Sequence, residues 1–349
     1  MRANSGTKGS LLWLLISQLT VAMALAAVVA GQQDSSAPTD SSSAQQPTSN
    51  PSANAASTPA QAAQTTEDGG FVFRKEVEEV ALHAIVVDEQ NHLISGLDRN
   101  AFTVYEDGKV QKMTSFRQEN AALALGILID NSGSMRPKRQ KVNDAVLNLV
   151  RASNPGDEVF VVNFGDDYYL DQDFTDDVGK LTQALNKIET RGTTALYDAI
   201  VASAAHVRQD AKIQKRVLLV VTDGRDNASE DTLQEAMQQI QRRDGPVVYV
   251  IAFLDQTKDQ GSTMRALQMI SQNTGGAAYF PRDINEVDAI TKSIARDIRY
   301  QYVIGYKSST PGTNHAYRSV EVLAAAAGHQ RLRVRTRTGY YGGPGTESQ

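Results

Sequence analysis

Between residues 121 and 298, short apolar runs alternate with amphipathic stretches, and this alternation limits the possible folds more than any other feature of the chain. The apolar runs cover residues 123–129, 159–164, 217–221, 247–253 and 277–280. The amphipathic stretches cover residues 142–152, 178–188, 196–207, 233–242, 264–273 and 287–298. Continuous apolar runs are typical of strands buried on both faces. We therefore expect an α/β fold: a doubly wound, mostly parallel, Rossmann-like sheet with helices on both faces.

The segments on either side of this region have a β-like pattern. Before it, Val80, Leu82, Ala84 and Val86 alternate with other residues, and strands are expected over 102–105 and 110–116 around a hairpin-type turn at 106–109. After it, strands are expected over 302–306, 319–323 and 332–336. We expect residues 70–118 and 299–343 to form one small β-rich domain, into which the α/β unit at 121–298 is inserted.

The N-terminal fifth of the chain has the composition of an exported protein. Residues 1–30 carry Arg2 and Lys8 before a long apolar run that ends in small residues, which predicts a secretory signal peptide or, alternatively, an uncleaved membrane anchor. Residues 31–69 are rich in Ser, Gln, Ala, Thr and Pro, so a disordered linker is expected there, with a short tail at 344–349. A periplasmic, cell-surface or secreted location follows from this interpretation.

Composition excludes several classes of function. The formal net charge is −5, which argues against nucleic acid as a partner, because phosphate binding requires a basic face. The chain has no cysteine, so zinc–thiolate, thiol redox and iron–sulfur chemistry are excluded. Its five histidines are scattered, and a histidine-rich metal site is therefore not expected.

A set of oxygen ligands stands where the expected strands end. Asp130, Ser132 and Ser134 follow the first apolar run directly, Thr194 precedes an expected helix, and Asp223 follows the run 217–221. In open α/β sheets, the carboxyl ends of the strands meet at the edge where ligands bind. Carboxylates and hydroxyls are hard donors that suit Mg²⁺, Mn²⁺ or Ca²⁺. The five residues therefore predict one divalent metal site.

This pattern resembles the metal-ion-dependent adhesion site of von Willebrand factor type A (VWA) domains, and residues 121–298 resemble the whole domain. Within the family the chain is most similar to the VWFA-related proteins of acidobacteria, as the turn at 106–109 and the segment 335–341 suggest. The resemblance implies metal-dependent recognition of a protein or peptide ligand. An exposed Asp or Glu of that ligand would complete the coordination, most naturally of Mg²⁺.

Two other functions are alternatives to this adhesion module. No nucleophile elbow, zinc-protease motif or phosphate loop is visible, so a non-enzymatic role is expected, with a metal-assisted hydrolase as the weaker alternative. A structural scaffold of an envelope assembly, in which the metal only holds the domain together, is the other alternative. Asp226 is expected to be a loop acid or, alternatively, to support the metal ligands without binding the metal, and the acidic residues at 166–173 are expected to lie in a solvated loop. The oligomeric state is not predicted.

Overall fold

The computed structural model describes residues 79–118, 120–187, 192–254, 260–309 and 316–342. The expected signal peptide or anchor, the expected linker and the C-terminal tail lie outside these residues. Among the described residues, no helix is both long and apolar enough to cross a membrane.

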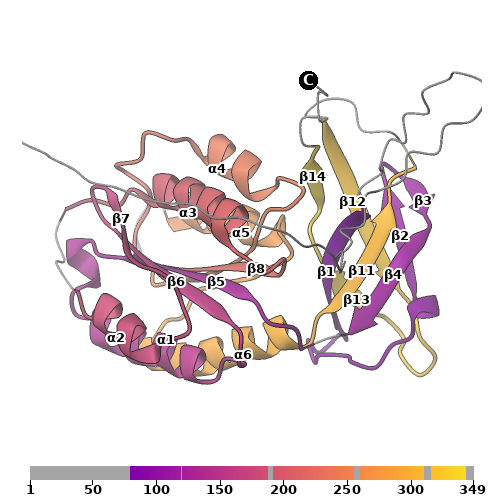
Figure 1. The fold of residues 1–349 in the computed structure, drawn as a ribbon, viewed down its shortest axis with the longest axis horizontal. Helices are drawn as coiled ribbons and strands as arrows, with labels where there is room; N and C mark the ends of the chain where they lie inside the picture. Colours follow the sequence, from indigo (N-terminus) through magenta and orange to yellow (C-terminus); the bar gives the residue numbers. More distant parts are fainter. Residues whose placement is uncertain (1–78, 119, 188–191, 255–259, 310–315, 343–349) are drawn as a thin grey trace, which may run out of the picture. The chain divides into compact units, whose positions relative to one another are not determined.

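The central sheet has six strands in the order β10-β9-β8-β5-β6-β7 (Figure 1). All neighbouring pairs are parallel except β6–β7, which is antiparallel. The strands are β5 (Ala124–Asp130), β6 (Glu158–Phe164), β7 (Tyr168–Thr175), β8 (Arg216–Thr222), β9 (Val247–Ala252) and β10 (Ala278–Tyr279). Every residue of β5 and β9 is buried, because helices cover both faces of the sheet. The expected doubly wound α/β fold is confirmed.

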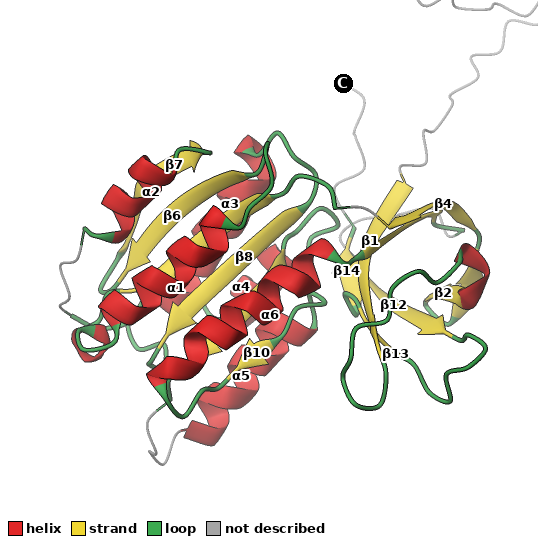
Figure 2. Ribbon diagram, turned by 90° about the horizontal axis from the view of Figure 1, so that it is seen from below, coloured by secondary structure: helices red, strands yellow, loops and turns green. Residues whose placement is uncertain are grey.

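Six helices form the two outer layers of the α/β unit (Figures 1 and 2). One layer contains α1 (Arg139–Arg151), α2 (Val178–Leu185) and α6 (Val287–Arg299), and the other contains α3 (Leu196–Asp210), α4 (Leu233–Ile240) and α5 (Gln260–Gln272). Each layer has its own apolar core against one face of the sheet. Local signals set several helix starts: Thr232 and Glu235 form a capping box at α4, and Asp177 caps α2.

Strands from both flanking segments pair with one another in two four-stranded sheets, ordered β13-β1-β11-β4 and β14-β12-β2-β3. The strands before the α/β unit are β1 (Glu79–Val87), β2 (Phe102–Glu106), β3 (Lys109–Gln111) and β4 (Met113–Gln118), and those after it are β11 (Tyr302–Lys307), β12 (Tyr317–Ala324), β13 (Arg333–Arg335) and β14 (Gly339–Tyr341). They share one apolar core. The inserted arrangement is therefore confirmed, while the boundaries proposed for each domain stay predictions.

Two expectations about single segments were wrong. The strand expected over 110–116 is interrupted at Lys112, so that β3 pairs with β2 in one sheet while β4 pairs with β11 in the other. The acidic segment expected to be a loop contains strand β7. Its first three residues are exposed at the edge of the central sheet, and it therefore lacks the apolar run of an interior strand.

The β-rich segments contact the α/β unit at the edge where the parallel strands begin. The guanidinium of Arg337, between β13 and β14, donates to the backbone carbonyls of Arg242, Arg243 and Gly245 at 3.1, 2.6 and 3.0 Å. These carbonyls lie between α4 and the start of β9. The opposite edge, where β5 and β8 end, carries the predicted site.

Candidate metal site

Four of the five predicted ligands are connected by short hydrogen bonds where β5 and β8 end. The backbone N–H of Ser132 donates to Oδ1 of Asp130 at 2.8 Å, and the hydroxyl oxygens of Ser132 and Ser134 lie 3.2 Å apart. The Ser134 hydroxyl donates to Oδ1 of Asp223 at 2.7 Å. Two loops that are 89 residues apart in the sequence therefore meet at this point.

The fifth residue, Thr194, reaches the same place through the loop that precedes α3. A Cβ atom added to Gly224 would lie 3.2 Å from the Thr194 hydroxyl oxygen, so this hydroxyl stands next to the loop that carries Asp223. The Thr194 backbone is held by Asn227, whose side-chain oxygen accepts from its N–H at 2.8 Å. The turn before it requires Gly192, which has a φ of +83°. All five predicted residues thus lie at one edge of the sheet.

Burial controls the electrostatics of Asp130. Its side chain is fully buried and its Oδ2 accepts a 2.6 Å hydrogen bond from the hydroxyl of Thr222. Burial raises the pKa of this carboxyl above its ordinary value, and the charge of Asp223 raises it further, while the hydrogen bonds from Thr222 and Ser132 oppose the shift. Two buried carboxylates this close to each other favour a cation between or beside them.

A positively charged residue already contacts one of these carboxylates, that of Asp223. The ammonium nitrogen of Lys138 lies 2.5 Å from Oδ2 of Asp223 and 3.3 Å from the carbonyl oxygen of Ser134. The side chain of Asp223 is 1% exposed, whereas that of Lys138 is 23% exposed. The ammonium therefore shows that a cation fits against this carboxylate, and the donor set of carboxylates and hydroxyls fits Mg²⁺ or Mn²⁺.

Sequence reasoning missed a second cation near the site. Arg139, the first residue of α1, is 1% exposed and donates to the side-chain oxygen of Asn163. Burial lowers the pKa of its guanidinium to about 10, although Asp130 and Asp171 act in the opposite direction. Asn163 in turn donates to Asp171 at 2.5 Å. An arginine beside a lysine at a helix start gave no signal that it would be buried.

The acids expected to be solvated loop residues have structural roles. Asp226 caps α3: its Oδ2 accepts from the backbone N–H of Tyr197 at 3.0 Å and from the hydroxyl of Ser229 at 2.5 Å. Asp166 accepts from the backbone N–H of Thr193 at 2.6 Å and so fixes the turn before Thr194. Both loops are therefore ordered by these carboxylates, which corrects the expectation that they only face solvent.

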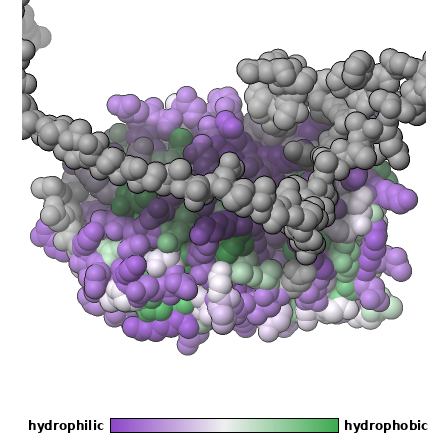
Figure 3. Space-filling model, in the orientation of Figure 1, coloured by the Kyte–Doolittle hydropathy of each residue, from purple (hydrophilic) through white to green (hydrophobic). Residues whose placement is uncertain are grey.

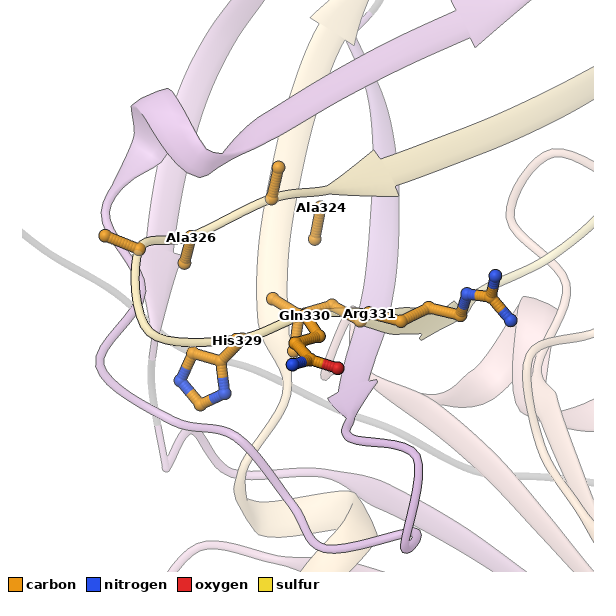
Figure 4. Close-up of a pocket in the computed structure, with 8 residues that line it drawn as sticks. Ala324, Ala326, His329, Gln330 and Arg331 are labelled. Carbon is orange, nitrogen blue, oxygen red and sulfur yellow. The ribbon is translucent and has the colours of Figure 1, made fainter.

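The described residues also form hollows away from the candidate metal site. One of about 440 Å³ lies in the loop between β12 and β13 and is lined by Ala324 to Ala327 and His329 to Leu332 (Figure 4). The side chains of His329 and Arg331 point in different directions there. In the described part of the chain, no group of three or more His, Cys, Asp or Glu side chains could hold a metal. The set around Asp130 differs from such a group because hydroxyl oxygens make up most of its donors.

Comparison with known proteins finds a similarity in the central region of the chain. A family profile described as von Willebrand factor type A domain matches residues 125–225. No curated protein matches the chain.

Several solved structures are similar to parts of the chain. A von Willebrand factor type A protein from Catenulispora acidiphila is 14% identical over 76% of this chain and 75% of its own, with a TM-score of 0.44. An aerotolerance-related membrane protein from Bacteroides fragilis is 19% identical over 51% of this chain and 98% of its own, with a TM-score of 0.41. A mussel byssus matrix protein with a zinc-occupied MIDAS motif is 17% identical, with a TM-score of 0.45, and the match covers 56% of this chain and half of the mussel protein. Residues 125–225 therefore match the von Willebrand factor type A domain profile, and they lie in the unit with the doubly wound, mostly parallel α/β sheet.

Proposed function

We propose that this protein is an exported, non-enzymatic interaction module that binds a protein or peptide ligand through a divalent metal ion. Asp130, Ser132, Ser134, Thr194 and Asp223 would hold the metal. The observation that carries the proposal is the meeting of two buried carboxylates and three hydroxyl side chains at the carboxyl edge of the sheet. When bound, the metal supplies an open coordination position that attracts a carboxylate of the ligand.

The residues of the chain determine how such a ligand would be held. The two Asp side chains are buried and Ser134 is exposed, so the site opens on the side of this hydroxyl. Five protein ligands leave one position of a six-coordinate Mg²⁺ open, and a hard anionic oxygen from an Asp or Glu of the partner would fill it. Mg²⁺ is the preferred ion in this proposal, with Mn²⁺ or Ca²⁺ as substitutes.

Exposed apolar side chains near the site support a protein ligand. On the edge strand β7, Tyr168, Tyr169 and Leu170 are 42%, 62% and 49% exposed. Tyr168 pairs with Phe164, which in turn pairs with Asp130, so these side chains stand two strands from the predicted ligands at the same edge. The face shown in Figure 3 is mostly hydrophilic, with separate apolar groups. Contiguous exposed apolar residues beside a site are typical of protein-binding surfaces.

Metal binding and metal-dependent capture test the proposal together. Calorimetry of the full chain with Mg²⁺ and Mn²⁺, beside the Asp130→Ala variant, should show binding only to the wild type. A pull-down with a library of acidic peptides should recover ligands only with metal present. The structural-scaffold alternative predicts metal binding without any metal-dependent peptide, and a hydrolase would turn over its peptide. We further propose that the chain is most similar to the VWFA-related proteins of acidobacteria, on the basis of the sequence of residues 102–116 and 335–341.

A further inference from the structure

The position of Lys138 gives the candidate site a built-in competitor for its metal. Its ammonium nitrogen lies 2.5 Å from Oδ2 of Asp223, at the carboxylate that the proposed function assigns to the metal. The ammonium also donates to the carbonyl oxygen of Ser134, 3.3 Å away. One cation therefore already neutralises part of the negative charge that a divalent ion would use.

The geometry allows this cation to leave. Lys138 precedes the first residue of α1, so its backbone is fixed by the helix while its four-carbon stem is free to rotate. Its side chain is 23% exposed, and a turn of the stem would carry the ammonium into solvent. Asp223, with a 1% exposed side chain, has no such freedom and needs a positive or hydrogen-bonding partner whichever cation is present.

We infer that Lys138 is a tethered cation that shares Asp223 with the metal and sets the metal concentration at which the site fills. The inference rests on the proposed metal-binding function. In the metal-free protein the ammonium stabilises the buried carboxylate; on metal binding it must move away, because two cations cannot occupy one carboxylate oxygen without repulsion. The site would then stay closed to carboxylate ligands until the divalent ion is abundant enough to displace the lysine.

Two matched lysine variants separate direct competition by Lys138 from the general effect that losing a nearby positive charge has on Mn²⁺ affinity. Lys141 lies on the same helix and its ammonium is also 2.5 Å from a carboxylate, that of Asp288. Asp288 belongs to α6 and is not one of the predicted ligands. The Lys138→Met variant should bind Mn²⁺ with a Kd about tenfold lower than the wild type, whereas Lys141→Met should leave Kd unchanged. Lys138→Arg, which keeps the charge, should resemble the wild type.

A second readout follows the lysine itself. Amine-labelling of the full chain, measured by peptide mass spectrometry with and without Mn²⁺, should show faster modification of Lys138 when the metal is added and no change at Lys141. This readout needs only wild-type protein, so it holds even if a variant fails to fold.

The outcomes distinguish this inference from the function on which it rests. Equal Mn²⁺ affinity of the wild type and Lys138→Met, with unchanged labelling of Lys138, would overturn the inference and leave the metal site standing. Binding to Lys138→Met but only weak binding to the wild type would support it. If no variant binds Mn²⁺ in the calorimeter, the proposed function fails and the inference fails with it.

Discussion

Two buried aspartates at opposite edges of the central sheet show how the molecule uses one residue type in two ways. Asp157 lies just before β6 and Asp223 lies just after β8, and their side chains are 2% and 1% exposed. Asp157 accepts from the backbone N–H groups of Leu123 and Asn154 at 3.0 and 2.8 Å, and it also pairs with Arg299. Its partners are therefore two fixed amides and a guanidinium from α6.

Asp223 has a different kind of partner. It accepts from the hydroxyl of Ser134 and from the ammonium of Lys138, and both of these groups can rotate. Asp157 thus ties the chain together at the edge where the strands begin, whereas Asp223 is held by contacts that can be exchanged for others. Burial alone therefore does not distinguish these two carboxylates, whereas the mobility of their partners does.

The largest effect is expected at Asp157. Replacing it with alanine in Asp157→Ala should lower the free energy of unfolding by about 3–5 kcal/mol, because a buried ion pair loses one member and two backbone amides lose their acceptor. Urea denaturation measures this. Manganese affinity should not change; a stable Asp157→Ala protein, or one with altered metal affinity, would remove the distinction between the two edges.

The counterpart at the other edge is Asp223→Ala. We expect the Kd for Mn²⁺ to rise by about 100-fold, equivalent to about 2.7 kcal/mol of binding free energy, because one of the two carboxylates is lost. The loss of stability should be smaller than at Asp157, since Ser134 and Lys138 can turn to water. Calorimetry and urea denaturation of the same preparation check both parts. A fall in stability as large as that of Asp157→Ala would favour the structural-scaffold alternative.

The edge where the strands begin should also respond to pH through His83. Burial lowers its pKa to about 3, and the charges of Lys215, Arg337 and Arg117 act in the same direction. Below pH 6.5 the unfolded chain therefore binds a proton at His83 that the folded chain does not bind. The free energy of unfolding consequently decreases as the pH is lowered, by about 2 kcal/mol from pH 6.5 to pH 5.

The free energy of unfolding is measured against pH for the wild type and for the His83→Gln variant. The difference between the two profiles isolates the contribution of His83, because the carboxyl groups of the two proteins titrate alike. Urea denaturation at five pH values between 5 and 7.5 suffices. Parallel profiles for wild type and variant would show that His83 is protonated equally in the folded and unfolded states.

The smallest effect is expected at Asp226, three residues from Asp223. Asp226→Ala should lower the free energy of unfolding by about 1 kcal/mol, because the N-terminus of α3 loses one of its two side-chain acceptors and keeps only the Ser229 hydroxyl. Manganese affinity should stay within twofold of the wild type, since Asp226 contacts Tyr197 and Ser229 and its hydrogen bonds serve the helix. A large loss of metal affinity would instead place Asp226 among the groups that support the site.

The periodicity of the apolar runs predicted the α/β fold because helices bury both faces of strands such as β5. It could not predict β7, an edge strand whose exposed residues include Tyr169 and whose sequence is acidic. The motif from Asp130 to Ser134 located the site because its spacing follows the end of a strand. The cations were missed for another reason: whether Lys138 and Arg139 face solvent or the site depends on the packing of α1, which no local pattern records.

The central claim is that one divalent ion binds at the five predicted residues, and anomalous diffraction tests it most directly. Crystals of wild type and Lys138→Met should be soaked in MnCl₂ and measured at a wavelength where manganese scatters anomalously. The account predicts one strong peak adjoining the oxygens of Asp130, Ser132, Ser134, Thr194 and Asp223, with higher occupancy in Lys138→Met. A peak at another place, or none in either protein, would contradict it.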